Sequence, residues 1–260
     1  MMSEQYQLAL LGFGNVGQAF ARLLQEKQDR LKEEHDLTWQ VTGIATGSHG
    51  IALDPQGIHV GRALEQVGSG GDLGALSTKP VSDSETFIRE CGADVLFETI
   101  PVNYDSGQPA LNLLRLGLEE GMHAVTANKG PVVHGYRQLK ELAHQHGRAF
   151  LFESTVMDGA PVFSIHRCGL PGAQITSLQG ILNSTTNFIL SRMEAGDTQK
   201  KAIRRAQEMG IAETDPGGDV DGWDAAVKVA ALVTVLMDIP LTPQHVDRQG
   251  IRDLDLDVMN

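Results

Sequence analysis

The sequence is poor in cysteine, in aromatic side chains and in long apolar runs. Its two cysteines, Cys91 and Cys168, lie far apart, and aromatic residues make up 5% of the chain. Two isolated cysteines exclude a disulfide scaffold and a zinc knuckle, and they favour a reducing compartment. Apolar stretches such as Val229–Met237 are too short to span a bilayer, and the polar N-terminus, Met1–Gln7, has no signal pattern. We therefore expect a cytoplasmic protein without a membrane segment.

Positive charge is also scarce. The chain has 21 Lys and Arg residues against 33 Asp and Glu, which gives a formal net charge of -12. An acidic surface repels phosphate backbones, so we expect no nucleic-acid partner. A hydrophobic content of 41% excludes intrinsic disorder, and 260 residues suffice for two modest domains. Glycine is abundant, with 29 residues, and this surplus indicates that backbone turns and backbone contacts with a ligand matter for function.

Apolar runs and helical patterns alternate through the first part of the chain. We expect strands at 6–11, 39–45, 94–100, 123–127 and 149–153, and helices at 16–34, 62–67, 83–89, 109–120 and 132–146. This alternation predicts an α/β fold with a Rossmann-type doubly wound parallel sheet, a dinucleotide-binding domain over residues 1–150. Residues 151–260 are expected to form an α+β domain, with a strand at 174–182 and helices at 185–194, 198–209 and 221–237.

A glycine-rich turn follows the first predicted strand. Residues 11–17 read L-G-F-G-N-V-G, so Gly12, Gly14 and Gly17 fill a GxGxxG frame between a strand and a helix. Such glycines permit a tight turn, let backbone N–H groups approach a pyrophosphate and let the helix close on the strand. This context favours dinucleotide binding over a glycine turn without a ligand.

The end of the second predicted strand leaves the choice between NAD and NADP open. Residues 45–49 read A-T-G-S-H, with no acid for a ribose hydroxyl and no Arg or Lys for a 2′-phosphate. Ser48 and His49 are the remaining candidates for that contact. The missing acid tilts the prediction slightly toward NADP.

A lysine follows the predicted strand at 123–127. In the segment H-A-V-T-A-N-K-G-P, Lys129 stands just beyond the strand's carboxyl end. Open α/β sheets bind their ligands at that edge, so Lys129 is a candidate for contact with a nicotinamide and a substrate oxygen. The alternative is a solvated loop lysine.

A second lysine follows a cluster of acids. Five carboxylates stand between residues 213 and 224, and Lys228 lies one helical turn after the last of them, Asp224. A lysine held by carboxylates at a partly buried helix start is a candidate proton donor. The alternative is a surface helix capped by Asp219 or Asp221. A calcium loop fails, because the third acid and the terminal Glu are missing.

Four segments together resemble the homoserine dehydrogenase family. LGFGNVG, TANKGP, GILNSTTNFIL and AETDPGGDVDGWDAAVKVA stand in family order and span residues 8 to about 237. The resemblance implies an NAD(P)-dependent enzyme that interconverts L-homoserine and L-aspartate 4-semialdehyde, in threonine and methionine biosynthesis. It also implies a homodimer, with residues 151–260 as a substrate-binding and dimerisation domain that is incomplete, because relatives continue further.

The same resemblance implies roles for individual residues. Lys228 would transfer the proton, with Lys129 as its catalytic partner at the nicotinamide and Asp219 orienting substrate and lysine. Homoserine would be bound by Glu213, which faces its ammonium group, by Asp224, and by Ser184 and Thr185 at its carboxylate end. The positions expected to contact the cofactor are Gly12, Phe13, Gly14, Asn15, Val16, Gly17, Thr99, Lys129 and Gly210.

Some relatives bind a monovalent cation through backbone carbonyls, which implies a Na⁺ or K⁺ site at Glu153, Val156, Asp158 and Ala160. Here Met157 and Asp158 replace smaller residues, a departure from the family pattern. Two other hypotheses stay open: a reductase of another small amino-aldehyde, and a non-catalytic or truncated dinucleotide-binding homologue. The complete set of acids and lysine in residues 213–228 speaks against a changed substrate.

Overall fold

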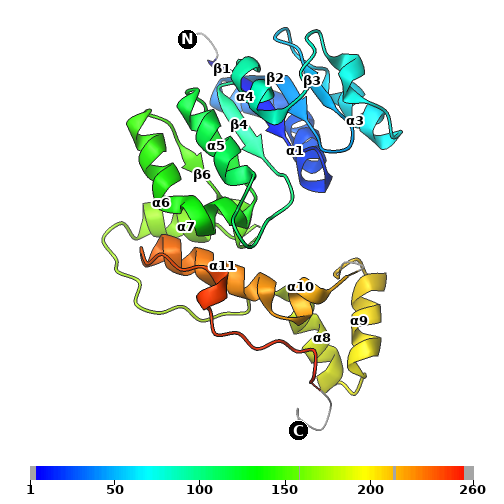
Figure 1. Ribbon diagram of the computed structural model, residues 1–260, viewed down its shortest axis with the longest axis vertical. Coiled ribbons are helices and arrows are strands. Elements are labelled where there is room, and N and C mark those ends of the chain that lie inside the picture. Colours follow the sequence, from blue (N-terminus) through cyan, green and yellow to red (C-terminus); the bar gives the residue numbers. More distant parts are fainter. Residues whose placement is uncertain (1–3, 158, 213–214, 255–260) are drawn as a thin grey trace. The chain divides into compact units, whose positions relative to one another are not determined.

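The computed structural model describes residues 4–157, 159–212 and 215–254 (Figure 1). The chain divides into two compact units, Met1–Thr155 and Val156–Asn260. Each unit has a hydrophobic core of its own, around Leu10 and Ile44 in unit 1 and around Ile189 and Met193 in unit 2. The two units are therefore described one after the other.

Unit 1 is built on a six-stranded sheet in the order β3-β2-β1-β4-β5-β6. The strands are β1 (Glu4–Leu11), β2 (Leu37–Ala45), β3 (Ile51–Leu53), β4 (Val95–Glu98), β5 (His123–Thr126) and β6 (Phe150–Leu151). All neighbouring pairs are parallel except β2 and β3, which are antiparallel. This order is that of doubly wound dinucleotide-binding sheets, so the predicted Rossmann-type α/β fold is confirmed.

The helices of unit 1 cover both faces of this sheet. They are α1 (Asn15–Glu26), α2 (Gln28–His35), α3 (Val60–Gly68), η1 (Leu73–Leu76), α4 (Ser84–Glu90), α5 (Ala110–Glu119), α6 (Lys129–Gln145) and η2 (Glu153–Thr155). Side chains of α1 and α3 share one core cluster with Leu10 of β1 and Phe97 of β4. On the other face, the ring of Phe87 in α4 lies over Gly43, and Leu96 packs against Gly117 of α5. Alternate residues of each strand thus serve opposite layers.

In its described residues, unit 2 consists of helices joined by loops. They are α7 (Val162–Ser164), η3 (Ile165–Gly169), α8 (Ser184–Glu194), α9 (Gln199–Glu208), α10 (Gly217–Val220), α11 (Trp223–Leu236) and η4 (Pro243–His245). The core joins Ile189 and Met193 of α8 to Ala202 of α9 and Val220 of α10. Ile251 completes it, and its N–H donates to the Val220 carbonyl at 2.8 Å.

Two predicted elements differ clearly from the structure, and one strand was not predicted. The strand expected at 174–182 is wrong, because this segment is a largely exposed coil, and the described part of unit 2 holds no strand that could pair with it. The helix expected at 16–34 is split at Lys27, where the apolar stripe ends and the polar α2, which buries no residue, begins. The short β3 was missed because a three-residue strand has too little pattern to detect. None of the described helices combines the length and apolarity needed to cross a membrane.

Candidate active site

The three glycines of the turn between β1 and α1 differ in the space around their Cα atoms. A Cβ added to Gly12, whose φ is +100°, would lie 2.7 Å from the carbonyl carbon of Thr99. A Cβ on Gly17 would lie 2.4 Å from the Gly12 oxygen, whereas a Cβ on Gly14 would meet nothing within 4 Å. Gly12 and Gly17 are therefore required by the fold itself, and Gly14 leaves open space in front of the turn.

The start of α1 fits an anionic group. Gly14 is the N-cap of this 12-residue helix and offers no side-chain cap, and the first turn holds no acidic residue. Gly14, Asn15 and Val16 are exposed, and the apolar Val16 side chain is 55% accessible. Unsatisfied N–H donors and the positive end of the helix dipole beside open space suit a pyrophosphate.

Phe13 and Thr99 have structural contacts of their own. The Phe13 side chain is buried in the core of unit 1, so only its backbone remains available to a cofactor. The Thr99 hydroxyl, at the end of β4, donates to the Gly12 carbonyl at 3.0 Å, and the Thr99 N–H donates to the Leu11 carbonyl at 2.8 Å. Thr99 thus ties β4 to the glycine turn at the point where the strand order reverses, which is the ligand-binding edge of such sheets.

The loop between β2 and β3 lies where a ribose contact is expected. The Thr46 hydroxyl accepts from the His49 N–H at 2.7 Å and donates to the Gly50 carbonyl at 3.0 Å, which closes a tight turn. The His49 ring Nδ1 lies 2.9 Å from the Gly71 carbonyl, so this nitrogen is engaged within the unit. Ser48 is exposed at the turn and remains a candidate contact.

Lys129 begins α6, three residues earlier than the helix start expected from the sequence. Its neighbour Asn128 is the N-cap, because the Asn128 Oδ1 accepts from the Gly130 N–H at 3.0 Å. The Asn128 N–H in turn donates to the Thr126 hydroxyl at 2.9 Å. Lys129 is therefore placed by a capped helix start at the carboxyl end of β5, and it is not a loop lysine.

In unit 2, Lys228 is held from two sides. Its ammonium lies 2.8 Å from Asp224 Oδ2 and donates to the Leu182 carbonyl at 2.7 Å. The Lys228 and Asp224 side chains are 16% and 14% exposed, so this pair is partly buried. The predicted i,i+4 pair is thus formed on one face of α11, in an environment that screens charge less than bulk water.

An asparagine links this pair to a second acid. Asn183 Nδ2 donates to Asp219 Oδ1 at 2.6 Å and to Asp224 Oδ2 at 2.9 Å. The same side chain caps α8, since its Oδ1 accepts from the Thr186 N–H at 2.7 Å. One buried amide therefore brings together Asp219, Asp224 and the start of α8, within one hydrogen bond of Lys228.

The other predicted substrate contacts divide. Ser184 is exposed at the first position of α8, whereas Thr185 is buried and its hydroxyl donates to the Ile211 carbonyl at 3.2 Å. Gly210, with φ +71°, ends the turn after α9. Glu213 lies outside the described residues, so its role as the ammonium-binding acid stays a prediction.

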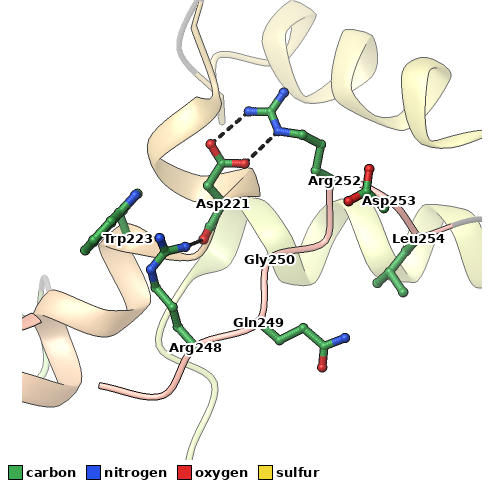
Figure 2. Close-up of a pocket in the computed structure, with 8 residues that line it drawn as sticks. All are labelled: Asp221, Trp223, Arg248, Gln249, Gly250, Arg252, Asp253 and Leu254. Carbon is green, nitrogen blue, oxygen red and sulfur yellow. Dashed lines mark hydrogen bonds and ion pairs between the residues drawn. The ribbon is translucent and has the colours of Figure 1, made fainter. Parts of the chain in front are cut away.

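Asp221 belongs to a different contact from the rest of the acid cluster. Figure 2 shows the Arg252 guanidinium facing the Asp221 carboxylate, with two hydrogen bonds of 2.7 and 2.9 Å. The hydrogen bond from Arg252 lowers the pKa of Asp221. Arg248 lies 3.7 Å from the centre of the Trp223 ring and donates to the Asp221 carbonyl. These contacts fasten the segment around Arg252 to α10 and the start of α11.

The predicted helix cap in the acid cluster is wrong. The N-cap of α11 is Gly222, with φ +77° and no side-chain hydrogen bond, so neither Asp219 nor Asp221 fills that position. A four-residue helix, α10, intervenes after the Pro216 turn. It places Asp219 and Asp221 before the cap instead of at it.

The predicted cation positions span the boundary between the two units. Glu153 belongs to unit 1, Val156 and Ala160 belong to unit 2, and Asp158 lies outside the described residues. Among the residues that the structure describes, no group of three or more His, Cys, Asp or Glu side chains could hold a metal ion. The predicted site consists of backbone carbonyls and not of such side chains, so the cation stays a prediction.

Two residues with central contacts were missed in the sequence. Asn183 stands inside the quoted segment GILNSTTNFIL, and its position before an S-T-T helix start was the available signal of a cap. Glu98 ends the apolar strand β4 with 0% exposure, and a lone acid closing a buried run was the signal there.

A doubly wound sheet with an open glycine turn at its switch point, followed by a unit with a carboxylate-bound lysine, is typical of a nicotinamide-dependent oxidoreductase. The homoserine dehydrogenase NAD-binding domain model matches residues 12–153, and the homoserine dehydrogenase model matches residues 161–260. The chain belongs to the homoserine dehydrogenase family, whose members are NAD(P)-dependent oxidoreductases acting on a CH–OH group.

Individual relatives agree with the family models. The chain is 38% identical to an NAD(+)-dependent homoserine dehydrogenase of Pseudomonas canavaninivorans, over 97% of this chain and 72% of that protein. It is 36% identical to the homoserine dehydrogenase of Methanocaldococcus jannaschii, over 94% of this chain and 73% of that protein. A hyperthermophilic archaeal homoserine dehydrogenase mutant, solved in complex with NADPH, matches with a TM-score of 0.82 and 30% identity over 96% and 75% of the two chains.

Proposed function

We propose that this chain oxidises L-homoserine reversibly to L-aspartate 4-semialdehyde, with Lys228 and Lys129 as its catalytic residues. The observation that carries the assignment of roles is the ammonium of Lys228, held at 2.8 Å by a carboxylate that also accepts from Asn183. When bound, the nicotinamide dinucleotide supplies or accepts the hydride.

The chemistry of the two lysines follows from their charge. In the reductive direction, the Lys228 ammonium donates a proton to the developing alkoxide of the substrate, and the Lys129 ammonium stabilises that negative charge. Two N–H donors of Lys228 contact Asp224 and Leu182, and we assign the third to the substrate oxygen. In the oxidative direction, neutral Lys228 takes the hydroxyl proton.

The acids of unit 2 suit an amino-acid substrate. A zwitterionic amino acid needs an anion for its ammonium group and donors for its carboxylate. We assign the ammonium contact to Glu213, with Asp224 as a second contact, and the carboxylate contact to Ser184 and Thr185. Because the Thr185 hydroxyl donates to Ile211, it acts as an acceptor unless that bond is exchanged, and the exposed Ser184 is the better donor.

The cofactor belongs at the glycine turn of unit 1. The open space at Gly14 and the uncapped N-terminus of α1 support a pyrophosphate there, with Asn15, Val16 and Thr99 beside it. Gly210 stays a predicted cofactor contact. Without an acid at the end of β2, we infer that NADP is accepted at least as well as NAD. We further propose a cytoplasmic homodimer that serves threonine and methionine biosynthesis, and a monovalent cation near Glu153.

A steady-state assay tests this proposal. The purified chain is supplied with L-aspartate 4-semialdehyde and, side by side, NADPH or NADH, and cofactor oxidation is followed by absorbance. We expect turnover with both cofactors and similar or better kcat/KM with NADPH. Cofactor binding without turnover would favour a non-catalytic homologue, and turnover of another amino-aldehyde alone would favour a different reductase.

A further inference from the structure

The strongest feature that the proposed mechanism leaves unused is a buried acid at the carboxyl edge of the sheet. Glu98 is the last residue of β4 and is 0% exposed. It is the register partner of Thr126, the last residue of the parallel neighbour β5, so both side chains point to the same face of the sheet. The acid therefore lies at the edge from which Thr99 and Lys129 follow.

The carboxyl group of Glu98 joins two turns. Its Oε1 accepts from the Ile100 N–H at 2.8 Å and from Asn128 Nδ2 at 3.4 Å, and its Oε2 lies 2.5 Å from the Thr126 hydroxyl. Asn128 is the residue that caps α6 and immediately precedes Lys129. Glu98 thus connects the turn after β4 to the turn after β5. It does so through Asn128, the N-cap of α6, and through Thr126, whose hydroxyl accepts from the Asn128 N–H.

The backbone of β4 extends this connection to the glycine turn. Thr99, the next residue after Glu98, binds the Gly12 carbonyl through its hydroxyl. Two consecutive residues therefore hold both parts of unit 1. Thr99 fixes the glycine turn proposed for the cofactor, and Glu98 fixes the start of α6, where Lys129 lies.

Stability alone is a poor reason for an acid at this position. Burial raises the pKa of Glu98, because removing water disfavours the charged carboxylate, while its hydrogen bonds to Thr126, Ile100 and Asn128 act in the opposite direction. A buried carboxyl group costs more free energy than an apolar side chain of similar size, so its presence is better explained by the geometry that it imposes.

We propose that Glu98 is a positioning residue that fixes Lys129 relative to the glycine turn. This inference rests on the proposed function, in which Lys129 stabilises the substrate oxygen. A misplacement of a catalytic group by about 1 Å can lower turnover by about 100-fold, so the contact needs no direct bond to substrate to matter.

Two variants and a matched control test the proposal. Glu98→Gln keeps one acceptor oxygen, and Glu98→Ala removes both. Thr42→Val is the control, because Thr42 is a 2% exposed polar residue of the same sheet whose hydroxyl binds the Leu8 carbonyl at 3.5 Å. We expect kcat to fall roughly 10-fold in Glu98→Gln and about 100-fold in Glu98→Ala, with the KM for NADPH within about twofold of the parent. Thr42→Val should lower only the melting temperature.

A double variant distinguishes positioning from general weakening of the fold. If Glu98 acts through Lys129, Glu98→Gln should have little further effect on kcat in a Lys129→Met background. Parent kcat in Glu98→Gln, or losses that add fully in the double variant, would overturn the proposal. If Glu98→Ala does not fold, Glu98→Gln and the double variant carry the test.

Hydrogen exchange gives a readout that does not require activity. The amides of Asn128 and Gly130 are both hydrogen-bonded within the cap, and we expect Glu98→Gln to raise their exchange roughly 10-fold while Thr42→Val leaves them unchanged. An inactive parent would defeat the proposed function and not this measurement. Unchanged exchange at both amides in Glu98→Gln would defeat the positioning role even in an active enzyme.

Discussion

Each unit contains an asparagine that caps a helix and donates to a carboxyl group. In unit 1, Asn128, which immediately precedes Lys129, caps α6 and donates to Glu98. In unit 2, Asn183 caps α8 and donates to Asp219 and Asp224, the latter paired with Lys228. The same arrangement of a capping asparagine and a carboxyl group therefore occurs in each unit.

The two asparagines differ in what they hold. The acid of unit 1 is buried and accepts from a backbone N–H, a hydroxyl and the Asn128 side-chain amide, so its contacts serve geometry. The acids of unit 2 are partly exposed, and one of them bonds directly to an ammonium. In the proposed function, the acid of unit 1 fixes positions, whereas the acids of unit 2 hold a charged lysine.

The largest expected effect is that of replacing Lys228, the lysine of unit 2. Lys228→Met should lower kcat by roughly two to four powers of ten, because the proton donor is lost, while the Kd for NADPH stays within about twofold. Stopped-flow turnover and fluorescence titration with NADPH measure the two quantities. A variant that keeps parental turnover would remove Lys228 from the chemistry.

The asparagine of unit 2 gives the next effect. Asn183→Ala should lower kcat/KM for homoserine by roughly 10- to 100-fold, because Asp219 and Asp224 lose their common donor. Loss of the cap should also lower the free energy of unfolding by about 1 kcal/mol. Asn183→Asp serves as control: it keeps a capping oxygen but places a third carboxylate beside the other two. If that variant were fully active, the amide donor would have no part in the site.

The glycines of unit 1 sharpen the contrast within a single turn. Gly12→Ala should lower the free energy of unfolding by about 1–3 kcal/mol, because φ is +100° and the added carbon meets Thr99. Gly14→Ala should leave the melting temperature unchanged, since φ is -78° and the space is open, yet weaken NADPH binding. Calorimetry and NADPH titration separate the two outcomes. If Gly14→Ala bound NADPH as tightly as the parent, the pyrophosphate would not bind at this turn.

The smallest expected effect concerns Asp197, a carboxylate of unit 2 that contributes to stability and has no proposed role in catalysis. Hydrogen bonds from Lys201 and Arg192, with the charge of Arg205 nearby, lower the pKa of Asp197 from 3.8 to about 2. A lowered pKa stabilises the fold fully above pH 3.8, and this contribution is lost as the pH falls through about 2. Asp197→Asn should therefore lower the melting temperature by several degrees at pH 7, and the difference should shrink toward pH 2.

An exposed ion pair provides the control for Asp197. Glu208 pairs with Arg204 at 2.9 Å, with side chains that are 59% and 80% exposed. Glu208→Gln should leave the melting temperature within error, because exposed pairs contribute little. If Asp197→Asn and Glu208→Gln lowered the melting temperature equally, Asp197 would contribute no more than an exposed surface charge.

Much of unit 1 could be predicted because its signals are local. β1 ends just before Gly12, β2 just before Thr46 and β4 at Glu98, and the GxGxxG frame requires only six consecutive positions. Unit 2 was harder. The apolar segment at 174–182 has the composition of a strand, but a strand also needs a partner, and hydropathy carries no information about one.

The site residues divide in the same way. Lys129, Asp224 and Lys228 could be singled out from their neighbours in sequence. For Asn183 and Glu98 the neighbouring residues indicate a helix cap and a buried acid but not their partners, because Asn183 contacts acids 36 and 41 residues away and Glu98 contacts a threonine 28 residues away. Contacts of that separation depend on how helices and strands pack.

By itself, the sequence determined the alternating sheet of unit 1, the glycine turn and the pairing of Asp224 with Lys228, since each arises from residues within a turn or two of one another. Only the tertiary structure decided that Gly14 is open while Gly12 and Gly17 are not, that Asp221 is taken by Arg252, and that Asn183 joins two acids. Those outcomes depend on which atoms of distant segments meet, and such meetings are fixed by packing and hydrogen bonding in three dimensions.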